Sequence, residues 1–381
     1  MNFRFSGLIL IMFFLCCASD VTAQSTLNPD VSVIPRFRLE SNDGINLPAK
    51  REFSRPDFSM EEFELALQAY LNPYARADIF LTKPGLGEEP VEVEEAYATF
   101  LRGLPLDLNV RMGKYLAEFG KLNSLHPHAW PFLTQPLSQA RFLGDEGIND
   151  LGVSASILIP TGAALYTKLT VDVLKGSSVA ALDPNATQLS GGPGLVDTVS
   201  AQPYYANSAR LMTFLPVGDN SDLEIGLSGL TGIHDPYNHY RFYYGNLDFK
   251  YKWKPDAYRS LVLQGEGLLN FRKVKEGGGD ASPVVRKEIV TGGFYVYGDF
   301  QFRKIFSIGA RCDWTLSPYS KDDKAQGVAV FFGFYPVEET TAFRLQYQHT
   351  RTESPGAATL SVNTVTLQFM FSMGPHKAHP F

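Results

Sequence analysis

Cysteine is nearly absent from this chain. Only three cysteines occur among 381 residues, and two of them, Cys16 and Cys17, lie close to the N-terminus. An intrachain disulfide framework is therefore excluded for the rest of the chain, where Cys312 is alone. Cys312 shares one face of an alternating run with Ala310 and Trp314, so we expect it to act as a small apolar side chain.

Long apolar runs and an excess of basic residues are also missing. Beyond residue 23 no stretch is long and apolar enough for a membrane-spanning helix, which needs about 18 such residues. The formal net charge is −6, which argues against a nucleic-acid-binding protein, because such proteins carry clustered basic residues. Aromatic residues are abundant, with 28 Phe and 18 Tyr. Aromatic girdles at two membrane interfaces would account for them.

The N-terminal segment has the pattern of a secretory signal peptide. Arg4 precedes an apolar stretch over residues 8–17, and Val21-Thr22-Ala23 forms a cleavage site with small residues at the right spacing. We therefore predict a signal peptide over residues 1–23 and export of the mature chain. A lipoprotein is the alternative, but the residue before a lipidated Cys is normally small and would here be Leu15 or Cys16.

The mature chain consists of short runs in which apolar and polar residues alternate, the pattern of half-buried β-strands. Pro35 interrupts the first run, Phe80 is an apolar residue on a polar face, and Glu95 falls on an apolar face. The sixteen runs cover residues 31–40, 61–71, 74–82, 91–101, 106–112, 151–159, 165–173, 209–215, 223–231, 242–253, 261–271, 290–302, 306–316, 328–335, 341–351 and 360–371.

The connections between these runs alternate as well. Those after even-numbered runs are short, as at Asn72-Pro73 and Arg303-Lys304, whereas those after odd-numbered runs are longer. Short periplasmic turns and long external loops are typical of transmembrane barrels, whose strands need about 9–11 residues. We predict an all-β fold over residues 24–381, a closed antiparallel transmembrane β-barrel of about 16 strands. Its two ends should lie on the periplasmic side, with residues 372–381 as a periplasmic tail.

One segment resembles a known family. The sequence EEAYATF, followed by VRMGKYLAEFGKLN, resembles the EAY…VRVGKF…PFG pattern of the phosphate-selective porin O and P family. Downstream, PFLTQPL and LGVSASI resemble further short motifs of that family, so the resemblance covers residues 94–157. It implies an outer-membrane porin, commonly a homotrimer, whose third external loop folds into the lumen and narrows it.

Residues 113–149 are the counterpart of that constriction loop. The charged residues expected to meet a solute there are Arg111, Lys114, Glu118, Lys121, Arg141, Asp145 and Glu146. Alternatively, they are solvated charges of an external loop. The polar faces of the runs carry both signs of charge, for example Lys168 beside Asp172, so the sequence does not predict anion selectivity.

Other chemistries find little support in the sequence. His126 and His128 are weak metal candidates, because structural zinc usually takes four ligands and the C-terminal His376 and His379 should lie on the opposite side of the membrane. No G-x-S-x-G motif indicates a hydrolase, and Gly277-Gly278-Gly279 lacks the remainder of a phosphate-binding loop. We expect neither an enzyme nor a cofactor.

The sequence therefore predicts an outer-membrane porin-like channel for passive diffusion of ions or small hydrophilic solutes. The alternative is an occluded barrel whose external loops bind a surface ligand or polysaccharide. An energy-coupled receptor would need an N-terminal plug, for which too few residues precede the second run. The expected partners are outer-membrane lipid, solutes, further copies of the chain and the barrel assembly machinery, whose signal resembles the aromatic end of the last run at Phe371.

Overall fold

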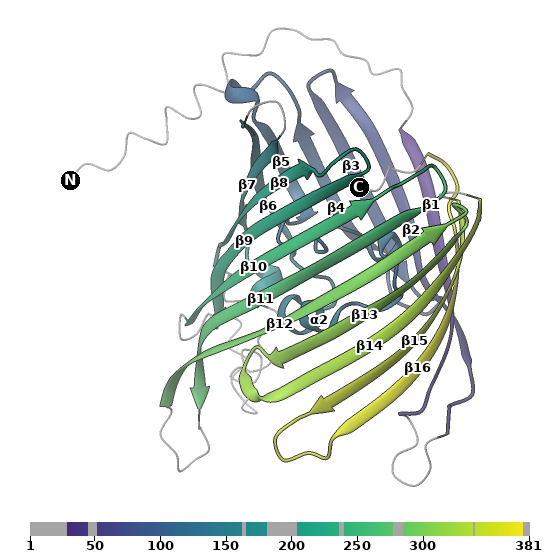
Figure 1. The fold of residues 1–381 in the computed structure, drawn as a ribbon. Helices are drawn as coiled ribbons and strands as arrows, with labels where there is room; N and C mark the ends of the chain where they lie inside the picture. The colour runs from purple at the N-terminus through teal and green to yellow at the C-terminus, as the bar shows by residue number, and fades with distance from the viewer. Residues whose placement is uncertain are drawn as a thin grey trace.

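The computed structural model describes residues 29–44, 52–161, 165–180, 204–235, 240–276, 285–337 and 340–375. Sixteen strands in these ranges form a closed antiparallel barrel, in which each strand pairs with its sequence neighbours and β1 pairs with β16 (Figure 1). The predicted fold class and strand number are thereby confirmed. The signal peptide predicted for residues 1–23, together with His376 and His379, lies outside the described residues.

The strands are β1 (Asp30–Asn42), β2 (Asp57–Asn72), β3 (Ala75–Pro84), β4 (Glu92–Phe100), β5 (Asn109–Leu116), β6 (Asn149–Pro160), β7 (Tyr166–Leu174), β8 (Ala206–Pro216), β9 (Ser221–Asp235), β10 (Tyr240–Trp253), β11 (Ser260–Glu276), β12 (Val285–Phe302), β13 (Phe306–Ser317), β14 (Ser320–Val337), β15 (Thr341–Glu353) and β16 (Leu360–Phe371). The short helices are η1 (Pro105–Asp107), η2 (Pro127–Ala129), α2 (Leu137–Leu143) and α3 (Ser177–Ala180).

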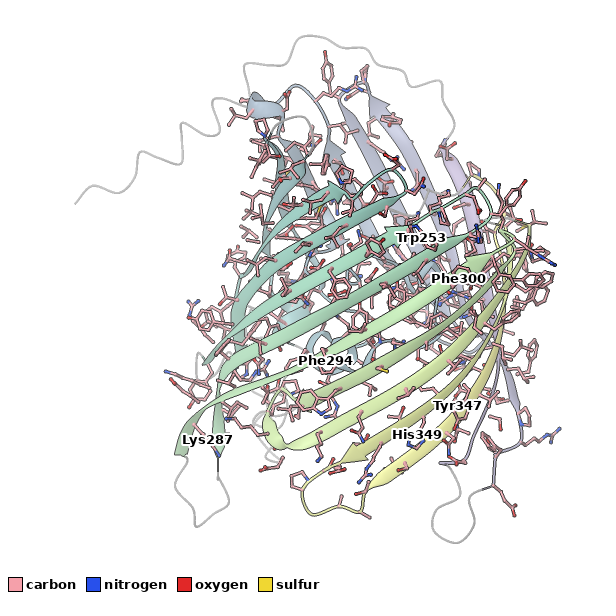
Figure 2. All side chains as sticks on the ribbon, viewed as in Figure 1. Trp253, Lys287, Phe294, Phe300, Tyr347 and His349 are labelled. Carbon is pink, nitrogen blue, oxygen red and sulfur yellow. The ribbon has the colours of Figure 1, made fainter. Side chains whose placement is uncertain are left out.

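The barrel is polar inside and apolar outside. Arg311 and Glu266 are buried in the lumen, whereas Leu227 and Leu247 on the outer face are 59% and 60% exposed. Figure 2 shows Phe294 among the outward side chains of the strands nearest the viewer. A water-soluble protein has the opposite arrangement. Apolar side chains on the outside are expected where lipid surrounds the strands.

None of the helices in the described ranges is long and apolar enough to cross a membrane.

Two irregularities of the alternation correspond to β-bulges. The register between β1 and β2 shifts at Arg36, directly after Pro35, as the proline predicted. The register between β3 and β4 shifts so that Phe80 pairs with Glu95 and Leu81 pairs with Val93. Glu94 is thus the extra residue of a bulge, which explains why Glu95 departs from the face of Val93.

Some connections differ from those expected. β13 ends at Ser317 and β14 begins at Ser320, so this connection after an odd-numbered strand is short. The polar sequence of residues 320–327 suggested a loop, but it forms the first part of an 18-residue strand. The side chains of residues 320–327 lie beyond the lipid-facing band, where the outer face of a strand must be apolar. The alternation that marks the other strands is therefore absent from this segment.

The C-terminal tail begins later than predicted. Beyond β16, Met373 forms a further bridge to Val33, with backbone N–H···O distances of 2.9 and 3.0 Å. The sheet therefore closes more tightly at this end than a free tail from residue 372 would allow.

Candidate functional site

The segment between β5 and β6 lies inside the barrel. β5 extends to Leu116 and β6 starts at Asn149, so this inserted loop comprises residues 117–148, slightly less than the predicted 113–149. Figure 1 shows its helix α2 within the ring of strands. The prediction of a third external loop folded into the lumen is thus confirmed.

Hydrogen bonds hold the inserted loop to several strands. The backbone N–H of Leu122 donates to Glu266 on β11 at 2.7 Å. Farther along, the N–H of Leu133 donates to Gln346 on β15 at 2.8 Å. Because these acceptors lie on separate strands, the loop is fixed across the lumen and not only at its two ends.

Aromatic side chains of the inserted loop pack on one side of the lumen wall, beside a cavity of about 350 Å³ that is lined by Trp130, Tyr297 and Arg344. Phe132 of the inserted loop packs edge-on against Tyr297 of β12 and Phe331 of β14, with ring centroids 5.2 and 6.1 Å apart. The guanidinium of Arg311 lies 4.3 Å from the Phe132 ring centre. Loop and wall are therefore in direct contact along β12–β14.

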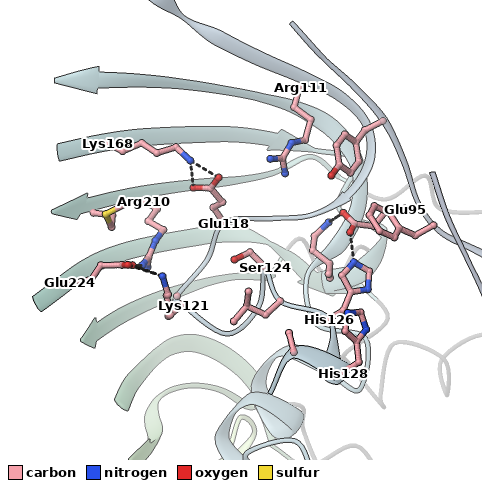
Figure 3. A pocket seen from close by; sticks show the side chains of 17 residues that line it. Glu95, Arg111, Glu118, Lys121, Ser124, His126, His128, Lys168, Arg210 and Glu224 are labelled. Carbon is pink, nitrogen blue, oxygen red and sulfur yellow. Dashed lines mark hydrogen bonds and ion pairs between the residues drawn. The ribbon is translucent and has the colours of Figure 1, made fainter. Parts of the chain in front are cut away.

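The other side of the lumen contains a cavity of about 320 Å³, here called the main cavity because three of the predicted charged residues line it (Figure 3). Its wall is formed by the inserted loop and by strands β3–β5 and β7–β9. The charged and imidazole side chains that line it are Glu95, Arg111, Glu118, Lys121, His126, His128, Lys168, Arg210 and Glu224.

Most of these charges form pairs that join the loop to the wall. Lys168 of β7 donates to Glu118 at 2.7 Å, and Lys121 of the loop donates to Glu224 of β9 at 2.7 Å. Burial alone would raise the pKa of the Glu118 carboxyl, but the ammonium of Lys168 outweighs it and lowers that pKa. Glu118 is consequently ionised at neutral pH.

Arg111 differs from the other cations of the main cavity. Its guanidinium lies 4.8 Å from the ring centre of Tyr97 and 5.4 Å from that of Tyr115. It forms no ion pair with any residue in the described ranges, and its buried Nε has no hydrogen-bond partner there. The charge of Arg111 is therefore balanced by the more distant carboxylates of Glu95, Glu118 and Asp172 and not by a direct ion pair.

A smaller cavity of about 120 Å³, here called the small cavity, lies nearer the end of the barrel that carries the inserted loop's connections. Four carboxylates line it: those of Glu62, Glu94, Asp145 and Glu146. Leu116 and Leu125 belong to the walls of both the small and the main cavity. The two spaces therefore approach each other at this pair of leucines.

The seven charges predicted from the sequence are thus divided among several places. Arg111, Glu118 and Lys121 line the main cavity, and the exposed Asp145 and Glu146 line the small one. The other two lie elsewhere.

Arg141 pairs with Asp323 of β14 at 3.0 Å. Lys114 shares the outer face of β5 with exposed Met112, and its Nζ donates to the carbonyl of Val93.

Sequence reasoning missed Arg210, Glu224 and Glu95 as cavity residues. Arg210 donates to Asp248 of β10 at 2.8 Å and lies 3.5 Å from Glu224. Arg210 and Glu224 could have been found, because each occupies the polar face of an alternating run. Glu95 could not, because its bulge reverses the alternation.

The two histidines of the inserted loop meet carboxylates from two strands. His126 Nε2 lies 2.7 Å from Glu95 Oε1, and His128 Nδ1 lies 3.2 Å from Glu64 Oε2 on β2. Burial lowers the pKa of His128. Burial also opposes the charge on His126, but Glu94 and Glu95 outweigh it and raise the pKa of His126 well above its ordinary value.

Comparison with solved structures shows the same fold at low sequence identity. An anion-selective porin from Comamonas acidovorans aligns with a TM-score of 0.56 and 10% identity, covering 91% of this chain and 99% of the porin. The outer membrane channel DcaP of Acinetobacter baumannii aligns with a TM-score of 0.54 and 11% identity over 92% and 99% of the two chains. A trimer form of OmpT, an outer membrane protein of Vibrio cholerae, aligns with a TM-score of 0.52 and 9% identity, covering 91% of this chain and 100% of OmpT.

Comparison by sequence identifies a relative. No established family profile matches the chain, so the narrower resemblance to phosphate-selective porins stays a prediction. An uncharacterized protein of Aquifex aeolicus (strain VF5) is 30% identical over 343 residues, which cover 85% of this chain and 70% of the relative. The chain therefore belongs to the same protein family as this Aquifex aeolicus protein.

Proposed function

We propose that the protein is a porin-like channel of the outer membrane through which ions or small hydrophilic solutes diffuse passively. The observation that carries this proposal is the inserted loop, beside which the lumen keeps three cavities with charged walls among the described residues. The main cavity and the small cavity share Leu116 and Leu125, so the proposed route past the loop runs between these two leucines. A channel of this kind needs no cofactor and performs no chemical reaction.

The charges along this route support a selective passage. Carboxylates dominate the small cavity, whereas the main cavity adds four cations, Arg111, Lys121, Lys168 and Arg210. Opposite signs on facing walls create a transverse field, and charged rings in a narrow lumen tune selectivity. We therefore propose Arg111, Glu118, Lys121, Asp145 and Glu146 as residues that contact the solute.

The outer surface supports placement in a lipid bilayer. Aromatic rings form a continuous row over seven strands, β12–β16, β1 and β2, with neighbouring ring centroids 4.9–6.3 Å apart. The rings of this row are those of Phe302, Phe306, Phe334, Phe343, Phe369, Phe37 and Phe58. An apolar band with aromatic girdles is the expected contact with lipid.

Export by the predicted signal peptide and assembly into a homotrimer complete the proposal. The trimer form of OmpT from Vibrio cholerae, whose fold this chain shares, supports the trimer.

The occluded barrel remains a second candidate because one observation favours it. Apolar side chains of the loop, including Phe132, pack directly on the wall, and Leu116 and Leu125 stand at the junction of the cavities. In such a barrel the junction would be closed to solutes, and only the external loops would meet a ligand.

Liposome swelling separates the two candidates. Liposomes containing the purified protein are diluted into isotonic solutions of sugars and amino acids of increasing size. A channel predicts swelling whose rate falls with solute size, whereas an occluded barrel predicts the rate of protein-free liposomes. Equal rates with and without correctly folded protein would refute the proposed function.

A further inference from the structure

Two histidines and a glutamate converge beside the main cavity, whose wall includes both imidazoles. His126 and His128 come from the inserted loop, and Glu64 comes from β2; one ligand atom from each lies within 4.8 Å of the other two. Glu64 and His128 are 1% and 7% exposed, so the cluster is largely withdrawn from bulk water. Figure 3 shows both imidazoles at the edge of the main cavity, beside Glu95.

The spacing of the three ligand atoms fits a metal ion. Glu64 Oε2 lies 3.2 Å from His128 Nδ1 and 3.5 Å from His126 Nδ1. A tetrahedral ion with bonds of about 2.0–2.1 Å holds its ligands about 3.3–3.4 Å apart, since the edge of a tetrahedron is about 1.6 times its centre-to-vertex distance. These two separations bracket that value, and the two imidazole nitrogens lie within 4.8 Å of each other, so one imidazole would move slightly to bind the ion.

A fourth carboxylate is within reach. Glu94 Oε2 lies 3.4 Å from His126 Nδ1, and both atoms are buried without a hydrogen-bond partner among the described residues. The bulge in β4 brings Glu94 and Glu95 to this place. Such bulges commonly redirect side chains at functional sites.

The surroundings orient His126 as a ligand. Its Nε2 lies 2.7 Å from Glu95 Oε1, and Glu95 Oε2 accepts the N–H of Leu116 at 2.9 Å. Metal-binding histidines usually donate their second ring N–H to a carboxylate in this way, which leaves the other nitrogen as the ligand. Pro127 fixes the backbone between the two histidines in the turn η2.

We propose that Glu64, His126 and His128 bind one divalent transition-metal ion, with Zn²⁺ as the best match to two imidazoles and a carboxylate. Water or Glu94 would complete the coordination. The ion would fasten the inserted loop to β2, because ligands from both would share it. This inference concerns the described cluster and holds whether or not the barrel conducts.

Metal titration of the purified full-length protein tests the proposal. Protein without an affinity tag is treated with a chelator, freed of it, and titrated with Co²⁺ and then with Zn²⁺. We expect one Co²⁺ per chain with the intense visible absorption of tetrahedral cobalt, and its loss when Zn²⁺ is added. His128→Ala should weaken Co²⁺ binding at least tenfold. Glu95→Gln should weaken it by about 10- to 100-fold, the usual effect of removing a carboxylate that orients a ligand.

Two controls separate this cluster from other histidines. His349→Ala removes an imidazole that contacts Asn363 near the barrel rim, and it should leave binding unchanged. The double variant His376→Asn/His379→Asn removes the C-terminal pair and should also bind one ion. Circular dichroism and thermal unfolding confirm that every variant is folded.

Several outcomes would overturn the proposal. One is that the folded wild-type protein binds neither Co²⁺ nor Zn²⁺ at metal concentrations of tens of micromolar. The cluster would then be a hydrogen-bonded group of imidazole and carboxylate side chains without a metal ion. Another is that binding disappears in the C-terminal double variant and persists in His128→Ala. A third is an octahedral cobalt spectrum with unchanged affinity in Glu95→Gln.

Discussion

Replacing Arg111 with Gln should shift ion selectivity toward cations. Arg111 is the cation of the main cavity without an ion-pair partner in the described residues, so its replacement removes a charge without breaking an ion pair, although Glu95, Glu118 and Asp172 partly compensate that charge. At about 5 Å in a water-like dielectric, one unit charge contributes about 0.8 kcal/mol. The substitution removes this attraction for an anion and the equal repulsion for a cation.

The two effects together change the cation-to-anion permeability ratio by about 1.6 kcal/mol, or about 15-fold at most. If only one of the two ions passes close to the guanidinium, the change is about fourfold. The assay is the zero-current potential across a planar bilayer with different KCl concentrations on its two sides. Concentrations near 0.1 M are suitable, because the screening length is then about 10 Å.

Lys114→Gln is the matched control. It removes the same charge three residues away, but Lys114 occupies the outer face of β5 and donates to the Val93 carbonyl. We expect no more than a small change in the potential. A ratio that changes less than twofold in Arg111→Gln, or equally in both variants, would refute the proposed route through the main cavity.

Three further predictions concern the loop and its supports. Deletion of residues 122–133 should raise single-channel conductance, because it removes the middle of the inserted loop; unchanged conductance of a folded deletion variant would contradict the constriction. Glu118→Gln should lower the melting temperature at pH 7. The difference from wild type should shrink as the pH falls below about 4.5 and vanish below the lowered pKa of Glu118. At that pH, protonation removes the same charge from the wild-type side chain. A difference that stays constant from pH 7 down to the lowest pH at which the wild-type barrel is folded would contradict this reasoning. Gly113→Ala should lower the free energy of unfolding in denaturant by at least about 2 kcal/mol. Gly113 has φ +136°, and an added Cβ would lie 2.2 Å from the carbonyl oxygen of Ala96. Gly267→Ala is the control, because the added methyl would have open space around it, and it should change stability much less.

Much of the barrel could be predicted from sequence because its physical cause is local. A strand between lipid and a polar lumen must alternate, so Leu108, Asn109, Val110 and Arg111 already indicate the two faces. The prediction failed where that constraint ends. Residues 320–327 extend a strand beyond the apolar zone, and nothing in their sequence requires alternation there.

The candidate site was harder to predict from the sequence, because contacts between residues far apart in the chain form it. The sequence located the inserted loop but not the direction of each side chain, and Lys114 lies on the outer face of β5. Glu64 and His128 are far apart in sequence, and their contact depends on how the loop crosses the lumen. Glu95 reaches His126 only because a bulge at Glu94 interrupts the strand.

Single-channel recording of the purified wild-type protein in planar bilayers tests the central claim most directly. We predict discrete conductance steps whose size increases with salt concentration, as ions pass between the inserted loop and the wall of β3–β5 and β7–β9. Bilayers that contain folded protein and show no steps at any salt concentration would contradict it.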